Sequence, residues 1–399
     1  MTAPRLSLCV SAAAVGLLTA FAVYQALWVN LAPDFFINRA GAEMGLRGES
    51  PYDRTKMQTL VAEQYPDNHL LIDQCGYFLP PQAVLMFAPV AAVSFPAAKV
   101  LWALVTGLSA AGLLLVLRGR DVRPLPPGAQ LLLPLVLTLN YLTVAVVELG
   151  QTSLMMTGCV AAGLWCFERK WPALGVLLWS VAFVKPHVAL PLIPLAWYLG
   201  GWKRAAALVA VVAVLNLIGA TLVGGSPLFL REYVAYLSSS HKAIVFNRAS
   251  VNPEITSWNR ILFVLTEPFA GDRFLIELTA TTTVAGYAVW FTLVAARCWL
   301  GRAKPSVAWA VASAAVGAAL CAQVLMYDLI MLTLAVPWIR DLFTAGRRTS
   351  GFAAVFLLGL QAIPFQVLNQ IGFDFHRPLG VALLAVLILV GPIPAKKTA

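Results

Sequence analysis

Long apolar segments recur along the whole chain and leave little of it for anything else. Of the 399 residues, 60% are hydrophobic and only 12% are charged, whereas a soluble domain carries roughly 25% charged residues. So few charges cannot cover the surface of a water-soluble fold of this size, and lipid must act as the solvent for much of it. The sequence therefore predicts an all-α, polytopic transmembrane helical bundle, because helices satisfy their own backbone hydrogen bonds in a bilayer.

Thirteen apolar runs are candidate spans. They are residues 6–28, 79–95, 97–117, 128–147, 150–167, 171–185, 187–200, 205–224, 275–297, 306–324, 325–339, 350–368 and 378–394. Both termini are expected in the cytoplasm, which requires an even number of crossings. Segment 79–95 is short and contains Pro80, Pro81 and Pro89, so it is the one least suited to cross. We expect about twelve spans.

The positions of the basic residues along the chain explain the net charge of +10. Basic residues cluster in short connectors at the ends of apolar runs: Arg118, Arg120, Arg123, Arg169, Lys170, Lys203, Arg204, Arg297, Arg302, Lys304, Arg340, Arg347, Arg348, Lys396 and Lys397. This is the positive-inside pattern, and it places those connectors in the cytoplasm. No basic face interleaved with aromatic residues is present, so the sequence does not indicate binding to nucleic acid.

This topology sends the remaining polar segments to the other side of the membrane. We expect a single membrane domain, 1–399, with a large extracytoplasmic loop at 29–78 and a second one at 226–274. Within the first loop, 35–47 and 55–65 mix apolar and charged residues and are predicted to form interfacial helices. The N-terminal run 6–28 is interpreted as a retained first span rather than a signal peptide.

Asp34 is the first candidate for chemistry. It lies just beyond the first span, where partial desolvation raises the pKa of a carboxylate and suits it to act as a general base towards a hydroxyl. The alternative is a helix N-cap for the segment that begins at Phe35, a frequent role of Asp. The two roles are compatible.

Two further polar motifs lie between apolar runs on the same side. Gln151 and Ser153 offer neutral hydrogen bonds to sugar hydroxyls, although an ordinary turn would contain such residues too. Lys185, followed by Pro186 and His187, is costly at this depth unless it is paired or functional. It is interpreted either as an ammonium that binds a lipid phosphate, assisted by His187, or as a lysine that snorkels to the interface.

Tyr327 and Asp328 interrupt the apolar stretch 306–339. An ionisable residue there indicates function, although Asp328 could equally pair with a basic residue of an outer loop. Arg248 and Arg260 in the second loop could hold a phosphate headgroup or lie in solvent. The six cysteines show no metal-binding spacing, and no nucleotide or cofactor motif is present. The sequence predicts neither a metal site nor a cofactor.

In this order the motifs resemble the polyprenyl-phosphate-sugar-dependent glycosyltransferases of GT-C type, in particular glycosyltransferase family 87. The resemblance covers roughly residues 30–335. It is carried by Asp34-Phe35, Gly48 to Tyr52, Phe78-Leu79-Pro80-Pro81, Pro89, Trp102, Gly150-Gln151, Lys185-Pro186 and Tyr327-Asp328. The family often has Tyr at the position of Leu79, Asn at that of Ser153 and, in some branches, His near Met326. These departures concern the sugar and the acceptor rather than the fold.

The resemblance implies an inverting transfer of a hexose, typically mannose, from a polyprenyl-phosphate donor to a lipid or glycan acceptor outside the cytoplasm of a bacterial inner membrane. Asp34 would be the catalytic base. Donor phosphate would be bound by Lys185, His187, Arg248 and Arg260. Sugar or acceptor would be bound by Gln151, Ser153, Tyr327, Asp328 and Tyr52. The main rival is a multi-spanning transporter or lipid flippase, against which no internal repeat is visible; an inactive, enzyme-like chain is the other.

Overall fold

Helices make up almost all of the chain that can be described. The structure, a computed structural model, describes residues 3–29, 33–64, 76–115, 127–224, 231, 233, 235–236, 255–266, 279–301, 305–364, 367–368, 370 and 375–392. Within these ranges there are helices and one isolated antiparallel bridge, between Thr256 and Val324, and no strand. The predicted all-α class is therefore confirmed for the described residues. Arg248 and most of segment 226–274 lie outside them.

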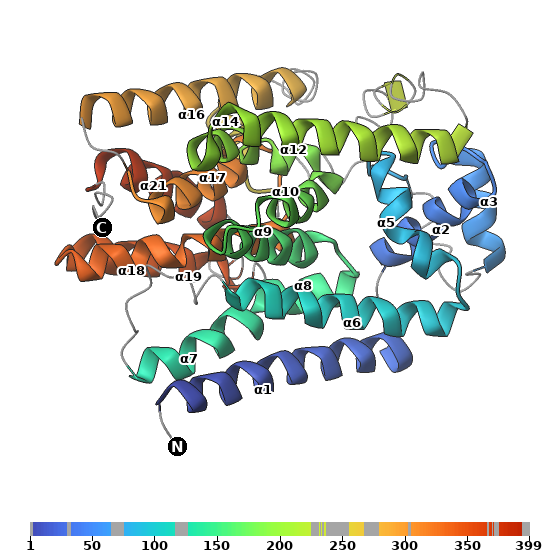
Figure 1. Cartoon of the computed structure of the whole chain (residues 1–399), viewed down its shortest axis with the longest axis horizontal. Helices are drawn as coiled ribbons and strands as arrows, with labels where there is room; N and C mark the ends of the chain where they lie inside the picture. Colours follow the sequence, from blue (N-terminus) through green and yellow to red (C-terminus); the bar gives the residue numbers. More distant parts are fainter. Residues whose placement is uncertain are drawn as a thin grey trace.

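Most helices run side by side along one axis of the molecule (Figure 1). In chain order the elements are α1 Ala3–Tyr24, η1 Gln25–Val29, α2 Pro33–Leu46, α3 Arg54–Gln64, α5 Gln82–Ala91, α6 Phe95–Leu114, α7 Pro127–Thr138, α8 Tyr141–Leu149, α9 Ser153–Glu168, α10 Pro172–Val181, η4 Ala182–Val184, α11 Pro186–Ala189, α12 Leu192–Gly224, α14 Trp258–Thr266, α16 Thr279–Gly301, α17 Val307–Cys321, η6 Met326–Ala335, α18 Val336–Thr344, α19 Arg348–Gln361 and α21 His376–Val390.

Five helical segments in the described part of the chain are long and apolar enough to cross a bilayer: Leu6–Val29, Phe95–Leu114, Leu132–Leu149, Leu192–Leu222 and Thr283–Gly301. Their exposed faces carry large apolar side chains, such as Leu108 at 73% and Trp299 at 80% exposure. Such faces need lipid around them. The chain is an integral membrane protein, and the count of twelve crossings stays a prediction.

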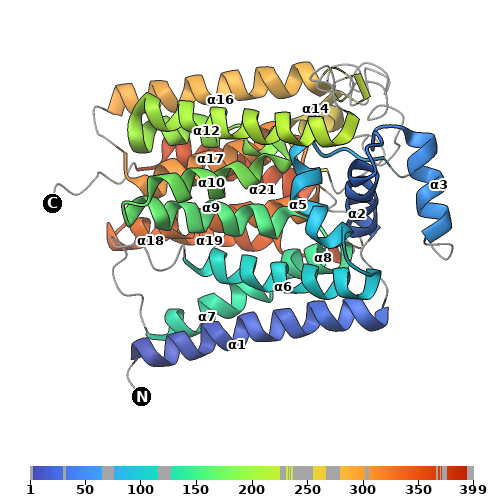
Figure 2. The same ribbon diagram turned by 45° about the vertical axis from the view of Figure 1, so that its right-hand side comes forward.

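One end of the bundle is closed by helices that lie across it. In Figure 2, α2, α3 and α5 lie at the end opposite to the N-terminus. Helices α2 and α3 occupy the ranges where the sequence predicts interfacial helices, and their position at a membrane surface stays a prediction. The ten residues of α5 span about 15 Å at 1.5 Å per residue, half of a hydrocarbon core of roughly 30 Å.

Arg39 fastens α2 to this end of the bundle. Arg39 is 7% exposed, and its guanidinium donates to the backbone oxygens of Val90 and Val93 at 3.3 and 3.1 Å. It also bonds Glu43 on its own helix and Gln64 on α3. Five N–H donors in one rigid plane suit such a junction. The start of α2, which carries Asp34, is thereby held against the bundle.

Close approach of α6 and α9 depends on glycine. A Cβ added at Gly158 on α9 would collide with the backbone oxygen of Ser109 on α6, and one at Gly112 would crowd the backbone oxygen of Gly158. Small residues at a contact let membrane helices pack backbone to backbone. This packing sets the position of α9, whose first residue is Ser153.

Helix α12 is interrupted near its start. Gly200 and Gly201 have non-helical backbone angles, and Gly201 has φ +71°, a conformation that glycine adopts without steric cost. The sequence predicts separate segments at 187–200 and 205–224, and the interruption lies at the end of the first.

Candidate active site

The network begins at Asp34, in the first turn of α2. The helix begins at Pro33, so Asp34 lies inside its first turn rather than just before it. Its Oδ2 accepts a hydrogen bond from Nε2 of Gln151. Burial raises the pKa of the Asp34 carboxyl from 3.8 to about 6, while the charge of Lys185 and the Gln151 hydrogen bond oppose this rise, and Asp328 adds to it. A carboxylate with such a pKa is ionised at neutral pH and readily accepts a proton near it.

A tight turn presents Gln151 and Ser153. Helix α8 ends at Leu149, and Gly150 follows with φ 66° and ψ 33°, the left-handed conformation that closes many helices. Helix α9 begins at Ser153. The side chains of Gln151 and Ser153 are buried, at 8% and 3% exposure. The turn expected from the sequence is therefore present, and it aims both polar side chains into the protein.

Lys185 links the two halves of the network. It follows η4 and precedes Pro186, and its extended backbone, with φ −122°, is the conformation that a following proline favours. Its Nζ donates to Asp328 Oδ1 at 2.7 Å, to Gln151 Oε1 at 2.9 Å and to Ser153 Oγ at 3.1 Å. An ammonium has three N–H donors, so the three bonds use all of them.

Asp328 provides the opposite charge. It lies in the 3-10 helix η6, is 5% exposed, and accepts from Ser153 Oγ at 2.5 Å as well as from Lys185. Breaking a buried ion pair by removing one partner is strongly destabilising, because the other charge stays buried without compensation. The Lys185–Asp328 pair thus ties η6 to the segment before α11. Lys185 Nζ also lies 4.6 Å from the centroid of the Tyr327 ring, within the range of a cation–π contact.

Asp34, Gln151, Lys185, Ser153 and Asp328 form one continuous chain of hydrogen bonds, which we call the buried network. Gln151 donates to Asp34 and accepts from Lys185, which fixes the orientation of its amide. Residues from four separate stretches of sequence are thereby brought to one point. The structure brings together these five predicted site residues with Tyr327.

Of the other predicted site residues, the structure describes Tyr52, His187 and Arg260, which are not among the five residues of the buried network. Tyr52 donates to the backbone oxygen of Leu79 at 2.7 Å and packs against the rings of Tyr77, Tyr233 and Tyr236. His187 has an exposed side chain, and its backbone oxygen accepts from Tyr287 at 2.5 Å.

Arg260 is buried on α14 at 7% exposure. Its segment is tied to the residues before η6 by the hydrogen bond from Thr256 N to Val324 O, at 2.8 Å. This bond brings the end of the second predicted loop towards Tyr327 and Asp328.

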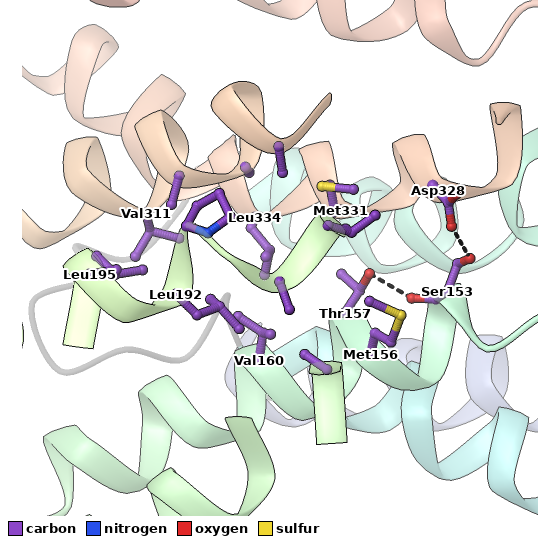
Figure 3. Close-up of a pocket in the computed structure, with 17 residues that line it drawn as sticks. Ser153, Met156, Thr157, Val160, Leu192, Leu195, Val311, Asp328, Met331 and Leu334 are labelled. Atoms are coloured by element: carbon purple, nitrogen blue, oxygen red, sulfur yellow. Dashed lines mark hydrogen bonds between the residues drawn. The ribbon is translucent and has the colours of Figure 1, made fainter. Parts of the chain in front are cut away.

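A pocket adjoins the network at Ser153 and Asp328. Its free space, part of which is open to the surroundings, is about 510 Å³. Figure 3 shows Ser153 and Asp328 at one end of it and Leu195 and Val311 at the other. Apart from Ser153, Thr157 and Asp328 its walls are apolar; they include Met156, Val160, Leu192, Ala314, Met331 and Leu334. We call it the bundle pocket. The apolar wall residues could not be identified from the sequence, because an apolar pocket wall has the same composition as a lipid-facing or core helix.

A family model matches this region of the chain. The model of glycosyltransferase family 87 matches residues 77–322, well over half of the length. The chain belongs to glycosyltransferase family 87. The family resemblance expected from the motifs is confirmed, and the chain is a membrane glycosyltransferase by family. No curated protein and no solved structure gave a match.

The family 87 match contains only part of the buried network. Gln151, Ser153 and Lys185 lie within residues 77–322, whereas Asp34 precedes this range and Asp328 follows it. The side chains of the two carboxylates reach the matched region through Gln151 and Lys185. The geometry therefore connects them to the family 87 segment independently of the match.

Proposed function

We propose that this family 87 chain transfers a hexose, mannose in the first instance, from a polyprenyl-phosphate donor to a hydroxyl of a lipid or glycan acceptor. The transfer takes place at the extracytoplasmic face of a bacterial inner membrane and inverts the anomeric centre. The observation that carries the proposal is the buried network itself. It joins a carboxylate whose pKa is about 6 to a buried ammonium and an apolar pocket.

Asp34 acts as the general base. The acceptor oxygen attacks the anomeric carbon as its proton passes to the Asp34 carboxylate. The bond between the anomeric carbon and the phosphate oxygen breaks, and its electron pair leaves with the polyprenyl phosphate. A single displacement with one base inverts the configuration. Gln151 holds the base in place by donating to Oδ2, and Ser153, Tyr327 and Tyr52 remain proposed contacts of the sugar or acceptor.

Lys185 stabilises the departing phosphate. All three of its N–H groups are used in the structure, so a phosphate oxygen must replace one acceptor. Ser153 is the weakest of the three by distance, at 3.1 Å, and its hydroxyl keeps its bond to Asp328. Exchange at Ser153 therefore costs least. His187, Arg248 and Arg260 are the proposed additional contacts of this phosphate.

The bundle pocket accommodates the start of the polyprenyl chain. Its polar end lies at Ser153 and Asp328, beside the proposed phosphate position, and its walls are apolar. A lipid with a charged head and a hydrocarbon chain matches this distribution. A nucleotide-sugar donor, which is polar over its whole length, does not.

Transfer of radiolabelled mannose from polyprenyl-phosphate mannose to a membrane lipid extract tests the proposal. We expect labelled product with purified protein and a loss of about 10²- to 10⁴-fold in Asp34→Asn, the usual size of a general-base contribution. Asp53→Asn is the matched control, since Asp53 is exposed and lies on the same predicted loop. Normal transfer by Asp34→Asn would reject the base. Absence of transfer from any lipid-linked sugar would favour the transporter.

Orientation is tested separately. A cysteine introduced at Ser50, in the turn between α2 and α3, should react with an impermeant maleimide added outside the cell. Labelling from the cytoplasm alone would reverse the proposed topology and reject a flipped, lipid-linked donor.

A further inference from the structure

A second pocket lies beside the residue that follows Asp34. It lies between α1, η1, α2, α6 and α8, and its free space, part of which is open to the surroundings, is about 330 Å³. Phe35, the neighbour of Asp34, forms part of its wall, and so does Val147, in the last turn of α8 before the Gly150 turn. We call it the interface pocket. It approaches the base from elements that the bundle pocket does not touch.

The wall of the interface pocket carries a cation. Lys99 on α6 is 9% exposed, and its Nζ lies 4.9 Å from the centroid of the Phe95 ring. Lys99 lies near the start of α6, and Trp102 and Thr106 continue the same wall one and two turns further along. A buried ammonium beside a pocket offers a point charge to an anion that enters it.

The wall also carries a hydrogen-bond acceptor that lacks a donor. Gln25 lies in the π-helical segment η1, and its Oε1 is buried without a hydrogen-bond partner. Short π-helical segments in α-helices frequently lie at functional sites. A buried acceptor is costly when nothing donates to it. A ligand with an O–H or N–H group would satisfy Gln25.

Lipid reaches this pocket from the side. On α1 and η1, Tyr24 and Trp28 are 53% and 70% exposed and their rings stack at 5.8 Å. On α6, Leu101 and Leu104 are 38% and 47% exposed. Aromatic residues at the end of a span mark the membrane interface. The interface pocket therefore lies between two lipid-exposed surfaces, at the depth where lipid headgroups begin.

We propose that the interface pocket binds the headgroup of an anionic membrane phospholipid. Lys99 Nζ binds a phosphate oxygen, Gln25 Oε1 accepts from a headgroup hydroxyl, and the acyl chains lie against the exposed faces of α1 and α6. Because Phe35 joins the pocket to Asp34, this lipid would be the acceptor or would lie beside it. That second step rests on the proposed glycosyl transfer, whereas lipid binding does not.

Tryptophan quenching measures the binding directly. Protein in phosphatidylcholine nanodiscs is titrated with phosphatidylglycerol or phosphatidylcholine brominated in the acyl chains, and the signal lost in Trp102→Phe reports the pocket. Phosphatidylglycerol has net negative charge and headgroup hydroxyls, and phosphatidylcholine has neither. We expect brominated phosphatidylglycerol to quench with about five-fold higher affinity, the usual effect of one basic residue near a lipid headgroup.

Variants assign that preference to residues. Lys99→Gln should abolish it and Lys99→Arg should retain it, while Lys56→Gln, an exposed lysine of α3, should leave it unchanged. Gln25→Leu should weaken it. Equal quenching by both lipids in the unaltered protein, or an unchanged preference in Lys99→Gln, would overturn the proposal, as would displacement of the lipid by millimolar inorganic phosphate. If the unaltered protein prefers phosphatidylglycerol but transfers no sugar, only the proposed function is rejected.

Discussion

The two pockets differ in how their polar groups are satisfied. At the bundle pocket, Ser153 and Asp328 are bonded to each other and to Lys185. At the interface pocket, Gln25 Oε1 is buried without a donor. A satisfied network is rigid and holds its members in one geometry. A buried acceptor without a donor is costly, and a ligand that donates a hydrogen bond to it removes this cost. The first pocket is therefore built to position groups, and the second is built to receive one.

The difference also separates two kinds of apolar surface. The walls of the bundle pocket come from α9, η4, α11, α12, α17 and η6, inside the bundle. The interface pocket instead lies between exposed side chains of α1 and α6. Two lipids can then approach the buried network from different directions, one beside Ser153 and Asp328 and the other beside Phe35. Such an arrangement suits a transfer between two lipid-borne substrates, and substitutions in the buried network and in the bundle pocket test its donor side.

The largest expected effect comes from breaking the ion pair of the buried network. Lys185→Met leaves the Asp328 carboxylate buried and uncompensated, and we expect a loss of about 3 to 5 kcal/mol in the free energy of unfolding. Thermal unfolding in detergent measures it. In the double variant Lys185→Met with Asp328→Leu, most of that loss should be recovered without recovery of activity. If the double variant is as unstable as the single one, the pair does not account for the cost.

The second effect concerns the walls of the bundle pocket. Ala314 on α17 is half-buried and lines the pocket, so Ala314→Leu should obstruct a lipid chain. We expect kcat/KM for a long polyprenyl donor to fall roughly ten-fold, equivalent to about 1.4 kcal/mol. A donor with a two-isoprene chain should lose less.

Ala310→Leu provides the control for this substitution. Ala310 is also half-buried, lies one turn earlier on α17 and is not part of the pocket wall. Equal losses with Ala310→Leu, or equal losses for the short and the long donor, would show that the pocket does not hold the chain.

Some of this arrangement was predictable from the sequence, for a physical reason. Asp34, Gln151, Lys185 and Asp328 are polar residues at the ends or in the interior of apolar runs, where polar groups are expensive and therefore conspicuous. Hydropathy also predicted the helical class, since α1, α6 and α16 have the length and composition of spans.

The pairing of these residues was not predictable. Lys185 and Asp328 are 143 positions apart. The fold brings them together because η6 and η4, the segment just before Lys185, both pack against α9. Sequence reasoning left the pairing of Asp328 with a basic residue as an alternative, but that alternative named the outer loops rather than Lys185.

The residues that line the pockets were equally hard to predict from the sequence. Met156 and Val311 face a cavity, whereas Leu108 faces outwards, and apolar composition does not distinguish the two environments. Gln25 and Lys99 were passed over because each is a single polar residue near the end of a span, where snorkelling to the interface is common.

The third effect is a shift in pH dependence. The Gln151 hydrogen bond lowers the pKa of Asp34, against the dominant effect of burial, so Gln151→Leu should raise that pKa above about 6. The base works when deprotonated, so activity is present above the pKa and is lost as pH falls through it. In a profile of kcat/KM against pH, the acid limb should lie near 6 in the unaltered protein and move to higher pH in Gln151→Leu. If the acid limb does not move in Gln151→Leu, Asp34 is not the base that sets it.

The smallest effect is expected at Tyr52, which lines neither pocket, and it tests whether that residue contacts a substrate. Its hydroxyl donates to Leu79 O at 2.7 Å within a group of tyrosine rings. Tyr52→Phe removes this bond and leaves the rings in place, so we expect a loss of about 1 kcal/mol in the free energy of unfolding. The acid limb should stay near 6. If Tyr52 contacts the sugar, Tyr52→Phe should instead raise KM for the donor or the acceptor and leave stability unchanged. Steady-state kinetics and thermal unfolding together distinguish the two roles.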